Sequence, residues 1–196
     1  NLVTTADIAT AMTLEGLRGT LTVFADDLQQ LRPHPGQAES AANVRTMLVD
    51  SEILEQAAAE FAQHHVQDAY SVRCSPQVTG GVRDTMEHAR LVAERELAAA
   101  VDNPVVAPDG RVVSNGNFHG APVAYALDFL AIVVADLASI SERRTDRFLD
   151  VARNRGLNAF LADDPGVDSG HMIAQYTQAG IVSELKRNAH PASADS

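Results

Sequence analysis

The segment from His119 to about Ala152 constrains the fold of this chain more than any other feature. Its middle part, Tyr125 to Ile140, is apolar almost all round. At 1.5 Å per residue the whole segment predicts a helix of about 50 Å, and such an apolar helix must be surrounded by other helices. Asp128 and Asp136 interrupt the apolar run, so it predicts a buried helix rather than a membrane span.

A second long helix is predicted to begin at Ser75-Pro76 and to stop at Asn103-Pro104. Apolar residues at spacings of three and four form one stripe along it: Val82, Met86, Ala89, Ala93, Leu97 and Val101. The following stretch, Val105 to Ser114, places Pro108-Asp109-Gly110 between short Val-rich runs, which predicts a small hairpin. A third helix is expected from Met172 to Lys186.

The first third of the chain predicts shorter helices. One is expected from Thr4 to about Asp26, a break follows at Arg32-Pro33-His34-Pro35-Gly36, and Ala38 to Val49 predicts another helix. Residues 51–66 are rich in Ala and Glu with few apolar anchors and are interpreted as a mobile helical arm. We therefore expect residues 1–196 to form one all-α unit, with long antiparallel helices near 76–102, 119–152 and 171–187 and one small β-hairpin.

Charge and cysteine content exclude several classes of partner. The 26 Asp and Glu outnumber the 15 Lys and Arg, giving a formal charge of −11, which argues against nucleic acid and anionic membranes. Cys74 is the only cysteine, so no disulfide forms within the chain and a cytoplasmic location is expected. The seven histidines show no HExxH spacing and the cysteine has no CxxC companion, so no metal site is expected.

The first chemically informative cluster is Gln67, Tyr70 and Arg73, spaced by three residues. If this segment is helical, the three side chains share one face. A guanidinium can bind a carboxylate through two parallel hydrogen bonds, a phenol can donate a hydrogen bond or exchange a proton, and an amide can orient a ligand. The same spacing also fits a surface helix with a solvated arginine and a half-buried tyrosine.

The second cluster runs from Ser114 to Gly120 and joins the predicted hairpin to the long apolar helix. Its two glycines permit tight backbone geometry. Phe118 and His119 fall at the N-terminus of the helix, where partial positive charge favours anions. Alternatively, this is a capped loop with Phe118 as a core anchor.

Together these clusters resemble the aromatic amino-acid ammonia-lyases, and histidine ammonia-lyases in particular. Residues 67–77 resemble the QDxYSxRCxPQ segment of that family, and residues 116–120 match its GNFHG/A loop. Further matches follow in the family's order over nearly the whole chain: residues 32–37, 101–104, 141–144, 166–170 and 191–196. The resemblance implies a helical bundle like that of fumarase and aspartase, assembled as a homotetramer whose active sites are shared between subunits.

The resemblance also implies roles for four residues. Arg73 matches the arginine that binds the substrate carboxylate, and Tyr70 matches the active-site tyrosine beside the electrophilic cofactor. Gln67 matches a glutamine that hydrogen-bonds in the same pocket, and Phe118 matches the ring that flanks the cofactor. The implied reaction eliminates ammonia from L-histidine to give urocanate.

The cofactor of that family is methylidene-imidazolone, formed from an internal Ala-Ser-Gly, and this sequence contains no Ala-Ser-Gly. The family's N-terminal tyrosine loop is also absent. The sequence begins with Asn1 rather than Met, and both ends are interpreted as cuts. We therefore expect the cofactor in a full-length parent, with no cofactor-binding residue here, and we expect the 196-residue chain alone to be inactive.

Three alternatives stay open. A tyrosine or phenylalanine ammonia-lyase or an aminomutase would have the same fold, although Cys74-Ser75-Pro76-Gln77 favours histidine. A non-catalytic helical oligomerisation module would also lack the Ala-Ser-Gly. The fumarase and argininosuccinate-lyase superfamily is less favoured because its Gly-Ser-Ser-x-Met-Pro loop is absent.

Overall fold

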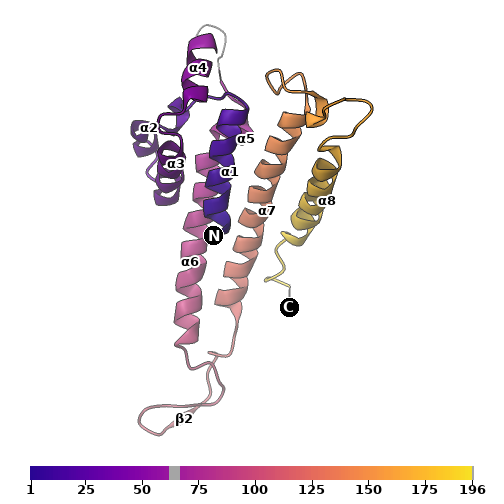
Figure 1. Cartoon of the computed structure of the whole chain (residues 1–196). Coiled ribbons are helices and arrows are strands. Elements are labelled where there is room, and N and C mark those ends of the chain that lie inside the picture. Colours follow the sequence, from indigo (N-terminus) through magenta and orange to yellow (C-terminus); the bar gives the residue numbers. More distant parts are fainter. Residues whose placement is uncertain (62–66, 196) are drawn as a thin grey trace.

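The computed structural model describes residues 1–61 and 67–195 as a bundle of helices with one small sheet (Figure 1). The α-helices are α1 (Leu2–Gly16), α2 (Asp26–Gln30), α3 (Pro35–Met47), α4 (Glu52–Phe61), α5 (Tyr70–Arg73), α6 (Ser75–Leu97), α7 (Ala121–Leu149) and α8 (Met172–Asn188). Two 3₁₀ turns lie at Thr22–Phe24 and Ala159–Leu161. Strands β1 (Val105–Val106) and β2 (Val112–Val113) pair antiparallel, with Val105 opposite Val113. The predicted all-α class with one hairpin is confirmed.

The helices α6, α7 and α8 are the long antiparallel elements that the sequence predicted (Figure 1). The 23 residues of α6 and the 29 residues of α7 correspond to lengths of about 35 Å and about 44 Å. The hairpin connects α6 to α7 at one end of the bundle, while α5 lies at the opposite end of α6. This arrangement fixes the distance between the two sequence clusters.

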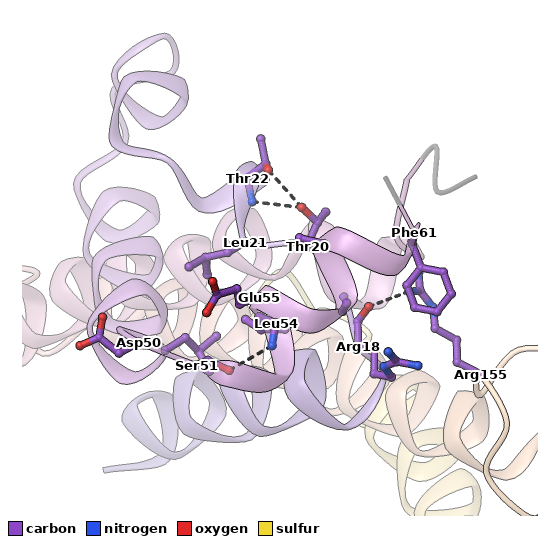
Figure 2. Close-up of a pocket in the computed structure, with 14 residues that line it drawn as sticks. Arg18, Thr20, Leu21, Thr22, Asp50, Ser51, Leu54, Glu55, Phe61 and Arg155 are labelled. Carbon is purple, nitrogen blue, oxygen red and sulfur yellow. Dashed lines mark hydrogen bonds between the residues drawn. The ribbon is translucent and has the colours of Figure 1, made fainter. Parts of the chain in front are cut away.

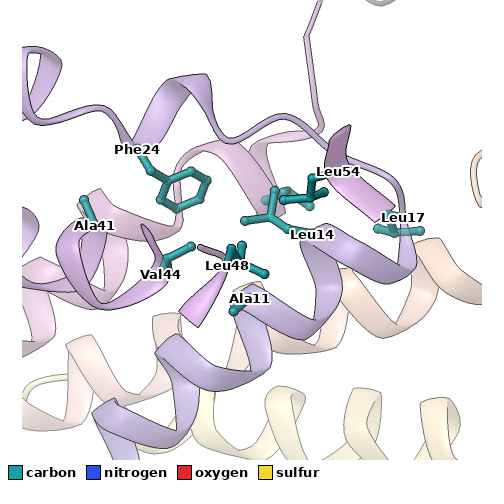
Figure 3. Packing of buried hydrophobic residues seen from close by; sticks show 9 residues of the cluster. Ala11, Leu14, Leu17, Phe24, Ala41, Val44, Leu48 and Leu54 are labelled. Carbon is teal, nitrogen blue, oxygen red and sulfur yellow. The ribbon is translucent and has the colours of Figure 1, made fainter. Parts of the chain in front are cut away.

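The first predicted helix is shorter than expected, because α1 ends at Gly16 instead of continuing to Asp26. Arg18 adopts a positive φ of 51°, and the chain then turns so that Leu17 and Phe24 enter one core. Figure 3 shows this core. Its members come from α1, the first 3₁₀ turn, α3, α4 and α5: Ala11, Leu14, Leu17, Phe24, Ala41, Val44, Leu48, Leu54 and Val72.

Helices α3 and α6 cross at two glycines with almost no space between their backbones. A Cβ added to Gly80 would lie 2.3 Å from the backbone nitrogen of Gln37, and one on Gly36 would lie 2.3 Å from the Gly80 carbonyl oxygen. The Gly36 amide also donates to Asp84 Oδ1 at 2.9 Å. The crossing therefore requires glycine at both positions.

Most of the predicted arm at residues 51–66 is a helix. Helix α4 covers Glu52–Phe61, with Leu54 and Ala57 buried. Residues 62–66 of this prediction lie outside the described residues. The mobility of the arm stays a prediction.

Helix α7 is only partly covered by the rest of the chain. In its most apolar stretch 22% is buried, and large side chains remain exposed: Tyr125, Leu127, Phe129 and Ile132. By length and composition α7 could span a membrane, a criterion that core helices of soluble proteins also meet. One copy of the chain therefore does not supply all the neighbours that such a helix requires in water.

Candidate functional site

The short helix α5 positions two of the residues singled out from the sequence. Val72 lies in the core with 2% of its surface exposed. The amide of Cys74 donates to the Tyr70 carbonyl at 2.9 Å and closes the turn. This anchoring leaves Tyr70 exposed and Arg73 half-buried, with the Arg73 guanidinium 4.5 Å from the centre of the Tyr70 ring.

Arg73 has no carboxylate within ion-pairing distance among residues 1–61 and 67–195, and its buried Nε has no hydrogen-bond partner there. Other arginines are differently placed: Arg83 lies 2.5 Å from Asp7 Oδ2. A half-buried guanidinium without an internal counter-charge has the donors that a carboxylate ligand needs. This is the strongest chemical feature of the α5 end.

Gln67 precedes α5 and does not belong to the helix, which begins at Tyr70. It therefore does not share the helix face that the spacing of three predicted. Its side chain is exposed at the same end of the bundle. The motif is anchored instead by Asp68, which is buried, accepts a hydrogen bond from the Thr20 amide at 2.7 Å and lies 3.5 Å from Arg155 Nη2.

Phe118 lies in the loop between β2 and α7, and 59% of its surface is exposed. Two asparagines fix this loop. Asn103 Oδ1 accepts hydrogen bonds from the Asn115 amide at 2.9 Å and the Ser114 hydroxyl at 3.1 Å. Asn115 Oδ1 in turn accepts from the Asn117 amide at 2.7 Å. The turn at residues 101–104 and the loop at residues 114–120 are thus one structural unit, which the sequence motifs alone did not indicate.

The structure does not bring Phe118 to Tyr70 and Arg73 within one chain. The 23 residues of α6 separate the two ends (Figure 1), a length of about 35 Å. No side chain is long enough to bridge that distance. If these residues act on one ligand, Phe118 must come from another copy of the chain.

Two hollows lie near the α5 end of the bundle. One of about 480 Å³ lies between α5 and α7 and is lined in part by Tyr70, Ser71 and Arg147, but not by Arg73. The other, of about 490 Å³, lies beside α4 (Figure 2) and contains none of the four predicted site residues. In it, the guanidinium groups of Arg18 and Arg155 lie 4.9 Å and 4.6 Å from the centre of the Phe61 ring.

Metal binding has no candidate in the part of the chain that the structure describes. Among those residues, no group of three or more His, Cys, Asp or Glu side chains could hold a metal ion. Cys74 is a free thiol beside α5.

Comparison with known proteins gives one family. The sequence profile described as "Aromatic amino acid lyase" matches residues 1–196. A histidine ammonia-lyase of Streptomyces avermitilis is 66% identical over 97% of this chain, and one of Streptomyces griseus is 65% identical over all of it. The chain spans only 37% and 38% of those two relatives.

Solved structures share the fold. The histidine ammonia-lyase of Trypanosoma cruzi is similar with a TM-score of 0.86 and 44% identity, covering 100% of this chain and 35% of that one. A tyrosine aminomutase of Streptomyces globisporus is similar with a TM-score of 0.89 and 34% identity, covering 99% of this chain and 40% of that one. The fold alone therefore does not separate a lyase from an aminomutase.

Proposed function

Because the chain belongs to the aromatic amino acid lyase family, we propose that it forms one wall of the catalytic site of a histidine ammonia-lyase. That enzyme eliminates ammonia from L-histidine and releases urocanate. The observation that carries the proposal is the guanidinium of Arg73, which lies beside Tyr70 without a carboxylate partner among the described residues. The identity of 65–66% to relatives named histidine ammonia-lyase supports histidine as the substrate.

Each of the four predicted site residues has a separate role in the proposed reaction. Arg73 binds the substrate carboxylate through two charge-assisted hydrogen bonds and so fixes the amino acid. The Tyr70 hydroxyl, next to that guanidinium, donates a hydrogen bond or takes part in proton transfer. Gln67 orients the bound amino acid from the same end of the bundle. Phe118 supplies an exposed ring from the opposite end.

The proposed cofactor is methylidene-imidazolone, which supplies the electrophile that makes the α-amino group a leaving group. The 196 residues contain no Ala-Ser-Gly, so none of them forms this group. The residues present fit a neighbour of that kind, because Phe118 and Tyr70 each present an exposed aromatic face suited to a flat heterocycle. We propose that the full-length enzyme is cytoplasmic, because the single cysteine of this chain fits a reducing compartment.

The proposed site requires more than one copy of the chain. The exposed apolar side of α7 continues into an apolar groove of about 300 Å³ between α6 and α7, lined in part by Met86, Ala93 and Leu127. Exposed apolar surface of this extent favours association with copies of the same chain. We propose a homotetramer in which α7 is buried and the α5 end of one copy lies near Phe118 of another. Light scattering that shows a monodisperse monomer at high concentration would contradict this.

The direct test uses a full-length lyase that carries this sequence. It is incubated separately with L-histidine, L-tyrosine and L-phenylalanine, and the released ammonia and organic acid are quantified. Urocanate formed from histidine, with little product from the other two, is the expected result. Cinnamate or coumarate as the main product would reassign the enzyme, β-amino acids would indicate an aminomutase, and no product at all would favour a non-catalytic helical module.

A further inference from the structure

Arg144 of α7 has an environment that packing does not explain. Its side chain is 3% exposed, and no carboxylate pairs with it in the described part of the chain. Burial lowers the pKa of its guanidinium to about 10. A buried charge without a counter-charge normally destabilises a protein, and an apolar side chain would pack there at lower cost. The burial of this arginine therefore indicates a functional role rather than a contribution to packing.

The hydrogen bonds of Arg144 indicate what that role is. Nη1 donates to the Ser71 carbonyl oxygen at 3.2 Å and to Thr10 Oγ1 at 3.1 Å, while the buried Nη2 has no partner among the described residues. Ser71 lies between Tyr70 and Arg73 in a helix of only four residues. The guanidinium thus connects α7 and α1 directly to the backbone that carries both candidate site residues.

We propose that Arg144 is a positioning residue, and that its hydrogen bond to the Ser71 carbonyl fixes the orientation of α5 and thereby of Tyr70 and Arg73. The inference rests on the proposed function. A helix of one turn has little stability of its own, and Val72 anchors only its buried side. A second, polar attachment is needed to fix its rotation. The neighbouring Arg143 has no such role, because it is exposed and donates hydrogen bonds to Glu142.

The first test is kinetic and uses a full-length lyase that carries this sequence. In Arg144→Met the value of kcat/KM should fall about tenfold or more, because small displacements of positioning groups reduce rates strongly. Arg144→Lys, which keeps one donor near Ser71, should lie between Arg144→Met and the unmodified enzyme. The matched control is Thr10→Val, which removes the acceptor on α1 only and should change kcat/KM by less than about threefold.

A double-mutant cycle separates positioning from general stability. In an Arg73→Met background, Arg144→Met should lower kcat/KM by a clearly smaller factor than it does in the unmodified enzyme, since one of the two residues that it positions is already lost. A purely structural role would reduce activity by the same factor in both backgrounds, and that result would overturn the proposal. Near-normal activity of Arg73→Met itself would instead contradict the proposed function, so this outcome differs from the one that overturns the positioning role.

The second readout does not depend on activity. The amides of Arg73 and Cys74 bond to the carbonyls of Ala69 and Tyr70 at 2.9 Å, so their hydrogen exchange reports on α5. Exchange should be faster in Arg144→Met than in Thr10→Val, and unchanged exchange in Arg144→Met would overturn the proposal. If Arg144→Met does not fold, Arg144→Lys replaces it in this test. Intermediate hydrogen exchange together with an intermediate kcat/KM supports positioning. A reduced kcat/KM with exchange as slow as in the unmodified enzyme contradicts it.

Discussion

Arg73 differs from the ion-paired arginines of this chain in having its guanidinium stacked on an aromatic ring with no carboxylate beside it in the described residues. A carboxylate held there by two charge-assisted bonds contributes several kcal/mol. In a full-length lyase, Arg73→Met should therefore lower kcat/KM by a factor on the order of a hundred or more, since about 1.4 kcal/mol is tenfold. Arg73→Lys should be intermediate, because an ammonium keeps the charge but loses the planar fork.

Steady-state kinetics on both variants, with folding checked by circular dichroism, measure this. A folded Arg73→Met enzyme with near-normal efficiency would show that the substrate carboxylate is bound elsewhere.

Tyr70 offers a different change, because removing its hydroxyl leaves the ring on which Arg73 stacks. If the hydroxyl acts in the transition state, Tyr70→Phe should lower kcat more than it raises KM. Saturation curves for L-histidine separate the two constants. A raised KM with unchanged kcat would instead assign the hydroxyl to substrate binding.

At the residue level, the sequence motifs identified candidate site residues but not the buried residues that hold those motifs in place. Arg73 and Tyr70 could be named because their segment resembles a known one. Asp68 and Arg144 could not be given roles, because their burial depends on α1, α5 and α7 coming together, and no local spacing encodes that. Gln67 was placed on a helix face only because the start of α5 could not be read from spacing.

Among the elements, the crossing of α3 and α6 gives a matched pair of variants. Gly80→Ala places a methyl group 2.3 Å from a backbone nitrogen of α3, so it should destabilise by about 1–3 kcal/mol or more. Gly81→Ala, in the next position of the same helix, meets nothing within 4 Å and should stabilise by up to about 1 kcal/mol through helix propensity. Urea unfolding of both variants measures the difference. Equal stabilities would show that the two backbones can move apart freely.

The contact between α7 and α8 should depend on pH. Glu142 is buried and accepts hydrogen bonds from Arg143 Nε at 2.5 Å and from Gln175 of α8 at 2.7 Å. The hydrogen bonds from Arg143 hold the pKa of this carboxyl below its usual value against the opposing effect of burial, and the hydrogen bond from Gln175 lowers it further. A lowered folded-state pKa means that its stabilisation is present above the unfolded value of about 4.3 and is lost as the pH falls through the folded value.

Glu142→Gln should therefore destabilise by about 1–2 kcal/mol at neutral pH, and the difference should shrink as the pH falls below about 4. Free energies of unfolding measured along a pH series test this. Glu96→Gln is the control, because the Glu96 carboxylate makes no hydrogen bond or ion pair among the described residues. If the free-energy difference between Glu142→Gln and the unmodified protein stays the same at acid pH, the charge of Glu142 does not stabilise the contact with α8.

The two longest helices were predictable, because an apolar stripe runs between Pro76 and Pro104 in the α6 segment and the middle of α7 is apolar almost all round. The ends of α6 and α7 differ from the predicted ones by a few residues. Helix α6 stops at Leu97, so Val101, which the predicted apolar stripe included, lies beyond its last turn. The N-terminal third was less predictable. Nothing local in Leu17 to Asp26 shows that the chain must turn to place Leu17 and Phe24 in one core.

On the scale of the whole molecule, the sequence predicted an apolar helix that needs neighbours, and one copy of the chain leaves much of α7 exposed. The same copy holds Arg73 and Phe118 at opposite ends of α6. Both observations are accounted for if copies associate through α7 and each catalytic site takes its α5 from one copy and its Phe118 from another. We propose this shared site for the full-length enzyme.

Complementation between two impaired variants tests directly whether the site is shared between copies. Full-length Arg73→Met and Phe118→Ala enzymes, each expected to have strongly reduced activity alone, are co-expressed with different tags, and mixed oligomers are purified through both tags. If the two residues of a site come from different copies, random pairing leaves roughly a quarter of the sites intact, and about that share of urocanate formation should return. Arg73→Met mixed with Tyr70→Phe is the control. Each site takes residues 70 and 73 from the same α5, so every site in this mixture carries one of the two changes and none is restored. Mixed oligomers of Arg73→Met and Phe118→Ala that form but are no more active than the separate variants would contradict the shared site.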